Sequence, residues 1–324
     1  MDTPKIAVII LNWNGIEDTV ECLESLSEVE YPNFEIIVAD NGSTDGSITL
    51  LRKSFQQVFL LENGENLGFA EGNNRAIKIA LDRGAKFLFL LNNDTIVAPD
   101  ALSAFIAKAD RQTILGPKLY TYSDPKRFDH LGGNWNQKLG QFDLIGNRVL
   151  DDGIQFEKSL ELDYVCGAAL FAPRQAFEKV GLLEKRYFLF FEESDFCLSA
   201  KKQGFRVLYI PEAKIWHKVS ASMTGGRPHT TYFFWRNRLL FLKRQIEAKE
   251  RRRLFWRVIF PEVLHIFKLY CLKSLQLRLW YCLKKGEDHS IRLRKIRTYK
   301  AALCGFRDYY LKRFGNAPSW IFGQ

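Results

Sequence analysis

Two aspartates of this chain stand directly after apolar segments that are typical of buried strands. Asp40 follows residues 34–39, and Asp94 follows residues 87–91 with two asparagines between. In an open parallel sheet, ligands bind beyond the carboxyl ends of the strands, so both carboxylates are expected at that rim. Hard cations prefer oxygen ligands, which makes Asp94 a candidate for holding a divalent metal. For either aspartate taken alone, a turn or a helix cap is the commoner role.

The glycine-rich loops that usually hold phosphates are missing from the sequence. Residues 12–15, after the first apolar segment, read NWNG and lack the dinucleotide-binding fingerprint, and the P-loop pattern is absent as well. A bound diphosphate therefore needs a metal ion to neutralise it, which again favours Asp94 as a metal ligand.

A second group of acids, Glu192, Glu193 and Asp195, lies within four residues at a predicted helix start. The positive end of the helix dipole stabilises carboxylates there, and capping alone accounts for one or two of them. Adjacent acids also raise one another's pKa, which suits one of them to accept a proton near neutral pH. We therefore expect Glu192 or Glu193 to be a general base, and Asp195 to cap the helix or orient a substrate.

The elements that must position these acids alternate between strand and helix. Apolar strand-like segments lie at residues 6–11, 34–39, 58–61 and 87–91, and apolar residues at helical spacing lie between them. Strands that are apolar on both faces predict an α/β protein with a parallel sheet covered on both sides. Later in the chain we expect strands at residues 164–171 and 207–210, the second ending at Pro211, and a helix over residues 195–203. Residues 120–153, punctuated by five glycines, are expected to form a long loop over the site.

The net charge of +10 is unevenly distributed along the chain. Residues 1–217 carry 23 Lys and Arg against 31 Asp and Glu, whereas residues 218–324 carry 24 against 6. The basic segment is rich in aromatic residues and leucine, but no stretch of about 18 uncharged apolar residues predicts a membrane span. Basic amphipathic helices on an anionic membrane surface fit this composition. Helices packed on the first domain, with a solvated basic face, are the alternative.

These shifts in composition predict a catalytic domain at residues 1–228. Residues 229–324 are expected to form a basic helical region. The six scattered cysteines show no zinc-like spacing and are typical of reduced thiols in an intracellular protein. The N-terminal residues lack the pattern of a signal peptide, so a cytoplasmic location is expected.

Four motifs occur in one order along the first third of the chain. They are residues 8–15 (VIILNWNG), 36–47 (IIVADNGSTDGS), 66–74 (NLGFAEGNN) and 87–94 (FLFLLNND). Together they resemble family 2 glycosyltransferases, specifically the subgroup that contains bacterial rhamnosyltransferases and galactofuranosyltransferases, over roughly residues 4–245. The resemblance implies a GT-A fold, a nucleotide-sugar donor, and Mg²⁺ or Mn²⁺ under the diphosphate. It also implies that the catalytic domain has a donor half at residues 1–117 and an acceptor half at residues 118–228.

The resemblance also assigns roles to particular residues. Asp94 occupies the last position of the family's DXD motif, Asn92 replaces its first aspartate, and His217 is expected to complete the metal site. Glu193 matches the base of an inverting transfer, a position where the family more usually has aspartate, and Glu192 stays an alternative. Gly167 and Asp195 are expected near the acceptor. The donor nucleotide is expected to contact Asp40 through its base, and also Asn12, Asn14, Asn66, Gly68, Asn73, Asn92 and Asn93.

The implied reaction is an inverting transfer from a dTDP- or UDP-sugar to a saccharide or polyprenyl-linked saccharide, in cell-surface polysaccharide biosynthesis. Such an acceptor and the basic segment predict a peripheral enzyme on the inner face of the cell membrane. A catalytically degenerate binding protein of the same fold is one alternative. A nucleic-acid-binding protein that uses the basic segment is another, but it leaves the acidic motifs unexplained and lacks a recognisable binding module. We therefore expect no nucleic-acid partner.

Overall fold

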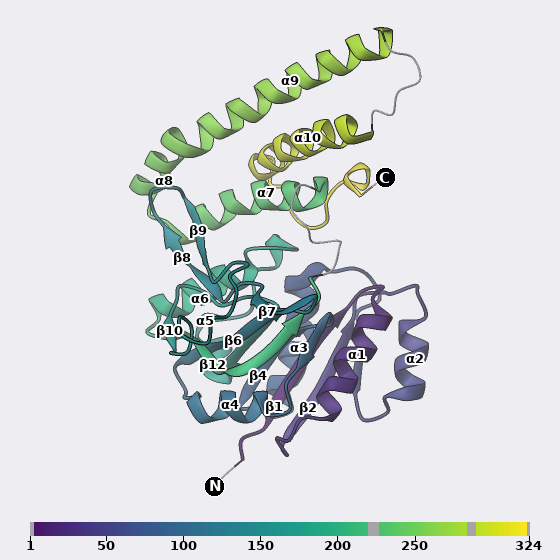
Figure 1. Ribbon diagram of the computed structural model, residues 1–324, viewed down its shortest axis with the longest axis vertical. Coiled ribbons are helices and arrows are strands. Elements are labelled where there is room, and N and C mark those ends of the chain that lie inside the picture. Colours follow the sequence, from purple (N-terminus) through teal and green to yellow (C-terminus); the bar gives the residue numbers. More distant parts are fainter. Residues whose placement is uncertain (1–2, 220–226, 284–289, 323–324) are drawn as a thin grey trace. The chain divides into compact units, whose positions relative to one another are not determined.

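The computed structural model of the chain describes residues 3–219, 227–283 and 290–322, without the side chains of residues 280–283. It divides into two compact units. The first unit comprises Met1–Trp135, Phe142–Phe188 and Glu192–Val219, and the second comprises Asn136–Gln141, Leu189–Phe191 and Ser220–Gln324. The two units have different architectures: the first is an α/β sandwich and the second is mainly helical (Figure 1).

The first unit is built on a ten-stranded sheet whose main path runs β10-β12-β6-β11-β4-β1-β2-β3 (Figure 1). Its parallel part consists of β1 (Ile6–Asn12), β2 (Phe34–Asp40), β3 (Phe59–Glu62) and β4 (Phe87–Asn92). These are the four strands that the apolar segments predict, with shifts of one residue at their ends. Successive residues of β1 enter different cores, because side chains alternate across a strand and both faces of this sheet are covered.

Helices cover the sheet on both faces, as Figure 1 shows. The core on one face contains residues of α1 (Ile16–Ser27), α2 (Ser47–Ser54) and α4 (Ala101–Lys108). The core on the other face contains residues of α3 (Gly68–Asp82), α5 (Arg174–Val180) and α6 (Glu192–Lys202). The predicted α/β class with a doubly covered sheet is confirmed.

The other half of the sheet mixes parallel and antiparallel strands. β11 (Ala169–Pro173) lies antiparallel between β4 and β6 (Thr113–Thr121), and β12 (Arg206–His217) runs parallel to β6. Two short strands, β5 (Thr95–Val97) and β10 (Leu160–Glu161), pair with β12.

The prediction that the last strand ends at Pro211 is wrong. The register of β12 against β6 shifts between Tyr209 and Lys214, and this irregularity accommodates the proline, which cannot donate a ladder hydrogen bond. The strand then continues to His217, which pairs with Thr95 of β5 and Thr121 of β6.

The prediction of one long loop over residues 120–153 is also wrong. This segment contains the end of β6, then β7 (Asp124–Phe128), and a hairpin of β8 (Gly132–Asn136) and β9 (Gln141–Ile145). Its strands are short and largely polar, so they lack the apolar alternation by which strands are recognised. Gly132 has φ of +130°, and an added Cβ would lie 2.2 Å from the Tyr164 carbonyl oxygen, so glycine is needed for the chain to pass there.

The helix that carries the three acids begins at Glu192, three residues earlier than predicted. Glu192, Glu193 and Asp195 therefore all lie in the first turn of α6, where the helix dipole favours negative charge. A short 3₁₀ turn, η1 (Lys185–Tyr187), precedes it in the chain.

The second unit consists mainly of helices, which confirms the predicted basic helical extension. They are α7 (Pro228–Gln245), α8 (Ala248–Leu254), the π-helical turn η3 (Phe255–Ile259), α9 (Phe260–Leu283), α10 (Ser290–Tyr310) and the 3₁₀ turn η4 (Ser319–Ile321). Gly305 lets α10 approach α7 closely, since an added Cβ would lie 2.3 Å from the Tyr232 carbonyl oxygen. Within the described ranges, no helix combines the length and the apolar character that crossing a bilayer demands.

Two arginines of α7 are buried inside this unit, at 0% exposure for Arg236 and 2% for Arg238. Arg236 donates to the Gly315 carbonyl at 2.6 Å and lies over the Phe233 ring. Arg238 donates to the carbonyls of Leu139 and Gly140 and forms an ion pair with Glu262 at 2.6 Å. A buried guanidinium is tolerated only when its donors are satisfied in this way, so Arg238 fastens the β8–β9 turn to α7.

Candidate active site

His217, at the end of β12, bridges two buried aspartates. Its Nε2 lies 3.1 Å from Asp94 Oδ1, and its Nδ1 lies 2.8 Å from Asp129 Oδ2. The pairing of β12 with β5 brings His217 beside Asp94, which directly precedes β5. The structure therefore brings together the two predicted metal ligands and adds a third residue, Asp129.

The electrostatics of this triad follow from its two hydrogen bonds. Burial lowers the pKa of His217, but the hydrogen bonds to Asp129 and Asp94 outweigh this effect and raise the pKa to about 10. Burial raises the pKa of Asp129, but the hydrogen bond to His217 and the neighbouring positive charges bring it below its ordinary value. Arg148, 3.3 Å from Asp129, supplies one of these charges. Both hydrogen bonds favour the protonated, cationic form of His217, so Nε2 must lose its proton before it can bind a metal ion.

The donor set of the triad fits a divalent cation. A metal-binding histidine commonly donates its second ring N–H to a carboxylate, which fixes the ring and its tautomer, and Asp129 stands in that position. Nε2 of His217 and Oδ1 of Asp94 are close enough to share one ion. The Asn93 amide donates to Gly15 and Thr19, whereas the partly exposed Asn92 side chain makes no hydrogen bond to the described residues. Asn92 can therefore offer an amide oxygen as a further ligand.

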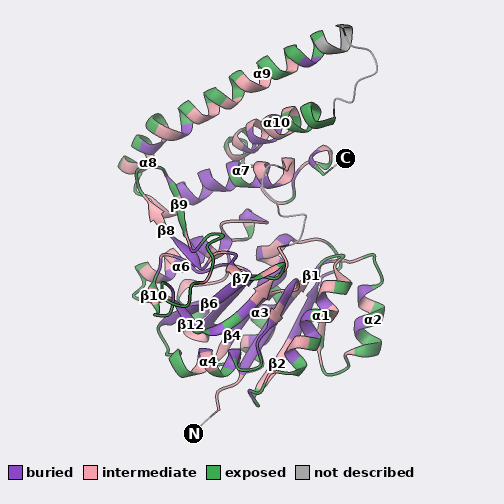
Figure 2. Cartoon of the chain, viewed as in Figure 1, coloured by how far each residue is buried: buried purple, intermediate pink, exposed green. Residues whose placement is uncertain are grey.

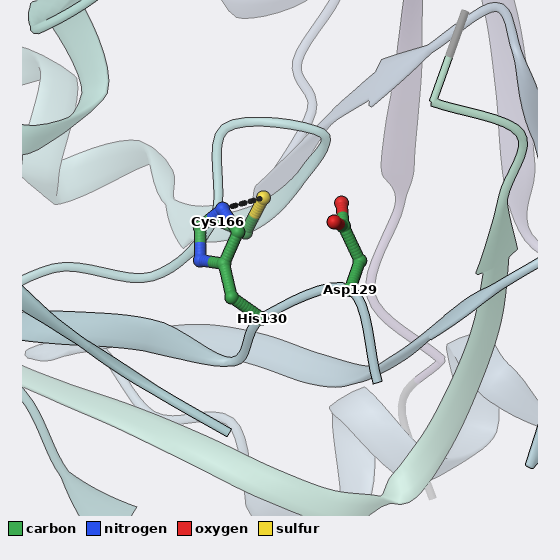
Figure 3. Close-up of side chains that lie close together, drawn as sticks. All are labelled: Asp129, His130 and Cys166. Carbon is green, nitrogen blue, oxygen red and sulfur yellow. Dashed lines mark hydrogen bonds between the residues drawn. The ribbon is translucent and has the colours of Figure 1, made fainter. Parts of the chain in front are cut away.

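Asp129 also belongs to a compact cluster with His130 and Cys166, whose ligand atoms all lie within 4.8 Å of one another (Figure 3). His130 Nε2 lies 3.3 Å from Cys166 Sγ, the contact drawn as a dashed line. Burial lowers the pKa of His130 and raises that of Cys166 to about 12. Cys166 is therefore a neutral thiol, and a thiol is a poorer metal ligand than a thiolate. The cluster is better described as the surroundings of His217 than as a separate metal centre.

Sequence reasoning assigned no role to Asp129 or His130. They lie in the glycine-rich segment that was expected to be a loop, where no periodicity shows which way a side chain points. The only local hint of a functional site was that an aspartate and a histidine are adjacent in the sequence. His217, which hydrogen-bonds Asp129, is 88 residues away in the chain.

The three acids of α6 differ in how accessible they are. Glu192 and Asp195 are buried, at 4% and 2% exposure, whereas Glu193 is half-buried. Burial raises the pKa of Glu193, although hydrogen bonds from the first-turn N–H groups and the charge of His130 oppose the shift. Glu193 is therefore a partly exposed residue whose carboxyl pKa burial moves toward neutrality, as a general base requires.

Asp195, which was expected near the acceptor, lies inside the first unit. The buried Tyr187 hydroxyl donates to its Oδ1 at 3.0 Å. In the structure this aspartate fastens the segment before α6 to the first turn of the helix.

The chain that enters α6 has an unusual backbone. Phe188, Phe190 and Phe191 have φ of +65°, +69° and +77°, a region that residues other than glycine rarely adopt. The Asn237 amide donates to the carbonyls of Leu189 and Phe190, at 2.6 and 3.0 Å. Strained residues of this kind cluster at functional sites, where surrounding contacts hold them in place.

Gly167, also expected near the acceptor, lies against the side chain of Glu193. An added Cβ would lie 3.1 Å from Cγ and 3.3 Å from Cδ of Glu193. The absence of a side chain at residue 167 therefore makes room for the carboxyl group of Glu193.

Replacing Gly167 with alanine is expected to shift the Glu193 side chain by a few tenths of an ångström and to lower kcat, by less than the roughly 10²-fold that a misplacement of about 1 Å costs. A matched test combines Gly167→Ala with Glu193→Gln, because displacing the side chain at residue 193 costs activity only while that side chain is the base. Steady-state kinetics should show that the double variant loses less than the product of the two single losses. Strictly multiplicative losses would show that the contact does not position Glu193.

The predicted donor residues Asn12, Asp40 and Asn93 are linked by a chain of hydrogen bonds through Thr19. The Asn93 amide donates to the Thr19 hydroxyl at 3.0 Å, this hydroxyl donates to the side-chain oxygen of Asn12 at 2.9 Å, and the Asn12 amide donates to Asp40 at 2.7 Å. The Ser43 N–H also donates to Asp40, at 2.8 Å. Asp40 is 0% exposed, so a nucleobase reaches its carboxylate only when the Asn12 and Ser43 groups move aside.

The remaining donor candidates shape the loops around this network. Asn14 is exposed, and its side-chain oxygen accepts from the Thr44 N–H at 2.7 Å. Asn66 accepts from the Gly68 N–H at 2.9 Å, and Gly68 packs against Phe188 with φ of +75°. Asn73 is buried, and its amide donates to the Phe69 carbonyl of the same helix. Gly68 and Asn73 therefore fix the backbone, while Asn14, Asn66, Asn92 and Asn93 keep partly exposed side chains.

This fold, with acids and asparagines at the ends of parallel strands, defines a class of sugar-transferring enzymes. The sequence model of Glycosyl transferase family 2 matches residues 7–181, which is more than half of the chain. The chain belongs to this family.

Three relatives show where the chain lies within the family. It is 28% identical over 248 residues to the N-acetylglucosaminyl-diphospho-decaprenol L-rhamnosyltransferase of Mycobacterium tuberculosis, covering 70% of this chain and 80% of that protein. It is 22% identical over 252 residues to the dTDP-rhamnosyl transferase RfbF of Shigella flexneri, with 74% and 80% covered. It is 32% identical over 239 residues to the uncharacterized protein y4gI of Sinorhizobium fredii, covering 68% of this chain but only 25% of that longer protein. The chain is therefore similar to the rhamnosyltransferase-like members of the family.

Solved structures support the same fold. GalNAc-T7 with UDP, GalNAc and Mn²⁺ aligns with a TM-score of 0.60 at 14% identity, over 96% of this chain and 56% of that chain. The mannosyltransferase PcManGT from Pyrobaculum calidifontis, with GDP-Man and Mn²⁺, aligns with a TM-score of 0.55 at 15% identity, over 96% and 88%. The predicted GT-A fold is confirmed.

Proposed function

We propose that this glycosyltransferase is metal-dependent and inverting, and that it transfers a rhamnose-type sugar from a dTDP- or UDP-sugar to a lipid-linked saccharide. The observation that carries the proposal is the side chain of the partly exposed Glu193, which lies against Gly167 and whose carboxyl pKa is raised by burial. The neighbouring Cys166 contacts His130, which adjoins the aspartate that holds His217. The proposed base and the proposed metal ligands therefore belong to one unit, and a series of direct contacts connects them.

In this mechanism Glu193 accepts the proton of the acceptor hydroxyl. The hydroxyl oxygen forms a bond to the anomeric carbon on the face opposite the diphosphate, and the bond from that carbon to the diphosphate oxygen breaks. The nucleoside diphosphate leaves with the bonding electrons, and the configuration at the anomeric carbon inverts. The raised pKa of Glu193 suits it to hold this proton.

Asp94 and His217 are proposed to hold Mg²⁺ or Mn²⁺, with Asp129 orienting His217 and Asn92 as a further oxygen donor. When bound, the ion supplies Lewis-acid stabilisation of the charge that develops on the leaving diphosphate. The network from Asn93 to Asp40 is proposed to shape the pocket for the nucleoside, with Asn14 and Asn66 at its exposed edge.

The acceptor is proposed to be a polyprenyl-linked saccharide at the inner face of the cell membrane, in cell-surface polysaccharide biosynthesis. The printed name of the Mycobacterium tuberculosis relative describes a decaprenol-linked saccharide of this kind. The excess of Lys and Arg in residues 218–324 supports the location, because anionic lipids attract such segments.

A thermal-shift screen of dTDP-, UDP- and GDP-sugars, with and without Mn²⁺, tests the proposal. We expect the melting temperature to rise only with a dTDP- or UDP-sugar plus metal, since a ligand at a hundred times its Kd stabilises by about 2.7 kcal/mol. NMR of the product of the active pair should show inverted anomeric configuration. Metal-independent stabilisation, or a product with retained configuration, would count against the mechanism. A salt-sensitive shift on DNA or RNA, with no response to any nucleotide sugar, would favour the nucleic-acid alternative.

A further inference from the structure

Helix α9 has apolar residues on more than one side. Those on one side pack inside the second unit, and those on another side are exposed. Leu277, near its C-terminal end, is buried, as is Ile259 in the preceding turn. On other sides of the helix, large apolar residues are about half exposed, and Figure 2 shows exposed residues recurring along its length. We call six of them, Trp256 of the preceding turn η3 and five residues of α9, the α9 stripe: Trp256, Phe260, Leu264, Phe267, Leu275 and Leu279.

The stripe residues recur at helical spacing along one side of the helix, although apolar residues also lie on its other sides. The first four members of the stripe follow one another at intervals of four, four and three residues, and Leu275 and Leu279 continue the pattern after the exposed Cys271. Residues three and four apart lie on the same side of a helix. Contiguous exposed apolar surface of this kind marks a site of interaction rather than ordinary solvated surface.

Basic residues accompany the stripe. Residues 248–283 carry eight Lys and Arg against two Asp and Glu. Of the two acids, Glu262 is held by the buried Arg238 and Glu250 lies 3.5 Å from Arg253. Lys268, Lys273 and Arg278 are all exposed on α9.

A basic cavity lies at the start of the stripe. Its volume is about 410 Å³, and Lys138 of the β8–β9 turn, Arg253 and Arg257 line it with Gln137, Glu250 and Leu254. Arg253 lies beside Glu250, so Lys138 and Arg257 leave the cavity with a net positive charge that suits the phosphate groups of lipids. Trp256 directly precedes Arg257 in the chain, and indole rings favour the same depth at a membrane surface.

We propose that the α9 stripe is a docking surface for an anionic lipid bilayer, with α9 lying in the plane of the interface. The apolar side chains enter the acyl boundary, while Arg257, Lys268 and Arg278 stay among the lipid phosphates. A helix of 24 residues spans roughly 36 Å at 1.5 Å per residue, so it covers a long track on the surface. A second copy of the chain is a poorer occupant, because a symmetric contact places this cationic helix against itself.

This inference deepens the membrane association of the proposed function by naming the surface responsible. Flotation of the full chain with vesicles tests it, using phosphatidylglycerol mixed with phosphatidylcholine in one arm and phosphatidylcholine alone in the other. We expect the wild type to float with the anionic vesicles about tenfold more than with the neutral ones, and less at high salt. The stripe variant Leu264→Ser/Phe267→Ser/Leu275→Ser should lose about tenfold of that binding.

The matched control is Leu144→Ser/Leu150→Ser/Ile154→Ser, which removes three exposed apolar side chains from the first unit. It should float like the wild type, within about twofold. The proposal is overturned if the wild type stays in the soluble fraction, if the stripe variant floats like the wild type, or if light scattering shows a dimer that only the stripe variant dissociates. The vesicles contain no nucleotide sugar, so failure here is distinguishable from failure of the transfer reaction, which the thermal-shift screen and product analysis report.

Discussion

The Glu193→Gln variant is expected to bind the donor and the metal normally but to transfer sugar roughly 10²–10⁴-fold more slowly, the range typical of losing a general base. Glutamine keeps the shape beside Gly167 but cannot accept the proton of the acceptor hydroxyl. In the wild type, kcat should fall on the acid side as Glu193 is protonated, at a pH above the ordinary range for glutamate, because burial raises its pKa. The variant's residual rate should lack this acid limb.

Glu192→Gln is the matched control, because it removes one carboxyl group from the adjacent position of the same helix turn. Glu192 is 4% exposed, whereas Glu193 is half-buried against Gly167. The control should therefore lose much less activity. A larger loss in Glu192→Gln than in Glu193→Gln would reverse the assignment of the base.

The Glu193→Gln variant should be more stable than the wild type at neutral and alkaline pH. The pKa of Glu193 is raised above the 4.5 of an unperturbed glutamate, so the folded protein holds this proton more tightly than the unfolded chain does. The stability that this carboxyl group contributes is fully present below about pH 4.5 and is lost as pH rises through the folded-state pKa. Glutamine stays neutral and avoids that loss. The gain in melting temperature should therefore appear at high pH and vanish in acid.

The second prediction with a large effect concerns Asp94. Asp94→Ala should lower transfer by about 10³-fold or more, because Lewis-acid stabilisation is worth several kcal/mol and each 1.36 kcal/mol is tenfold in rate. The Mn²⁺-dependent rise in melting temperature with donor should disappear as well. Retention of that rise in Asp94→Ala would place the metal elsewhere.

Asp129→Asn tests the outer carboxylate of the same triad. The neutral amide can still accept from the His217 Nδ1–H but lacks the negative charge of the carboxylate, so the Mn²⁺ concentration for half-maximal activity is expected to rise by about 10–100-fold, with kcat largely recovered at saturating metal. Asp124→Asn, in the neighbouring strand β7, is the control, since that aspartate pairs with the half-exposed Arg127 at 3.0 Å. An unchanged metal requirement in Asp129→Asn would remove Asp129 from the site.

Local patterns in the sequence were enough to predict the parallel half of the sheet and the rim where its acids stand. Residues 6–11, 34–39 and 87–91 are uniformly apolar, and a segment buried on both faces has this composition whatever surrounds it. The acids of α6 were likewise predictable at a helix start, because carboxylates gain there from the backbone of their own turn. The order of the four motifs indicated the family, which the sequence comparison confirms.

Other features depend on contacts between residues far apart in the chain, and no local pattern reveals them. The continuation of β12 past Pro211 depends on its register with β6, and the hairpin at residues 132–145 depends on glycines that pass close to Tyr164. The burial of Arg238 depends on carbonyls of the β8–β9 turn about a hundred residues away.

Asp94 shows the same division within one site. The sequence alone predicted that Asp94 follows a strand in an Asn-Asn-Asp motif, and the family resemblance predicted that His217 lies beside it. Only the tertiary structure decided that Asp129 holds the other side of His217 and that Gly167 makes room for Glu193. The physical reason is that strand and helix preferences act over a few residues, whereas hydrogen bonds and close packing act through space between whichever residues the fold brings together.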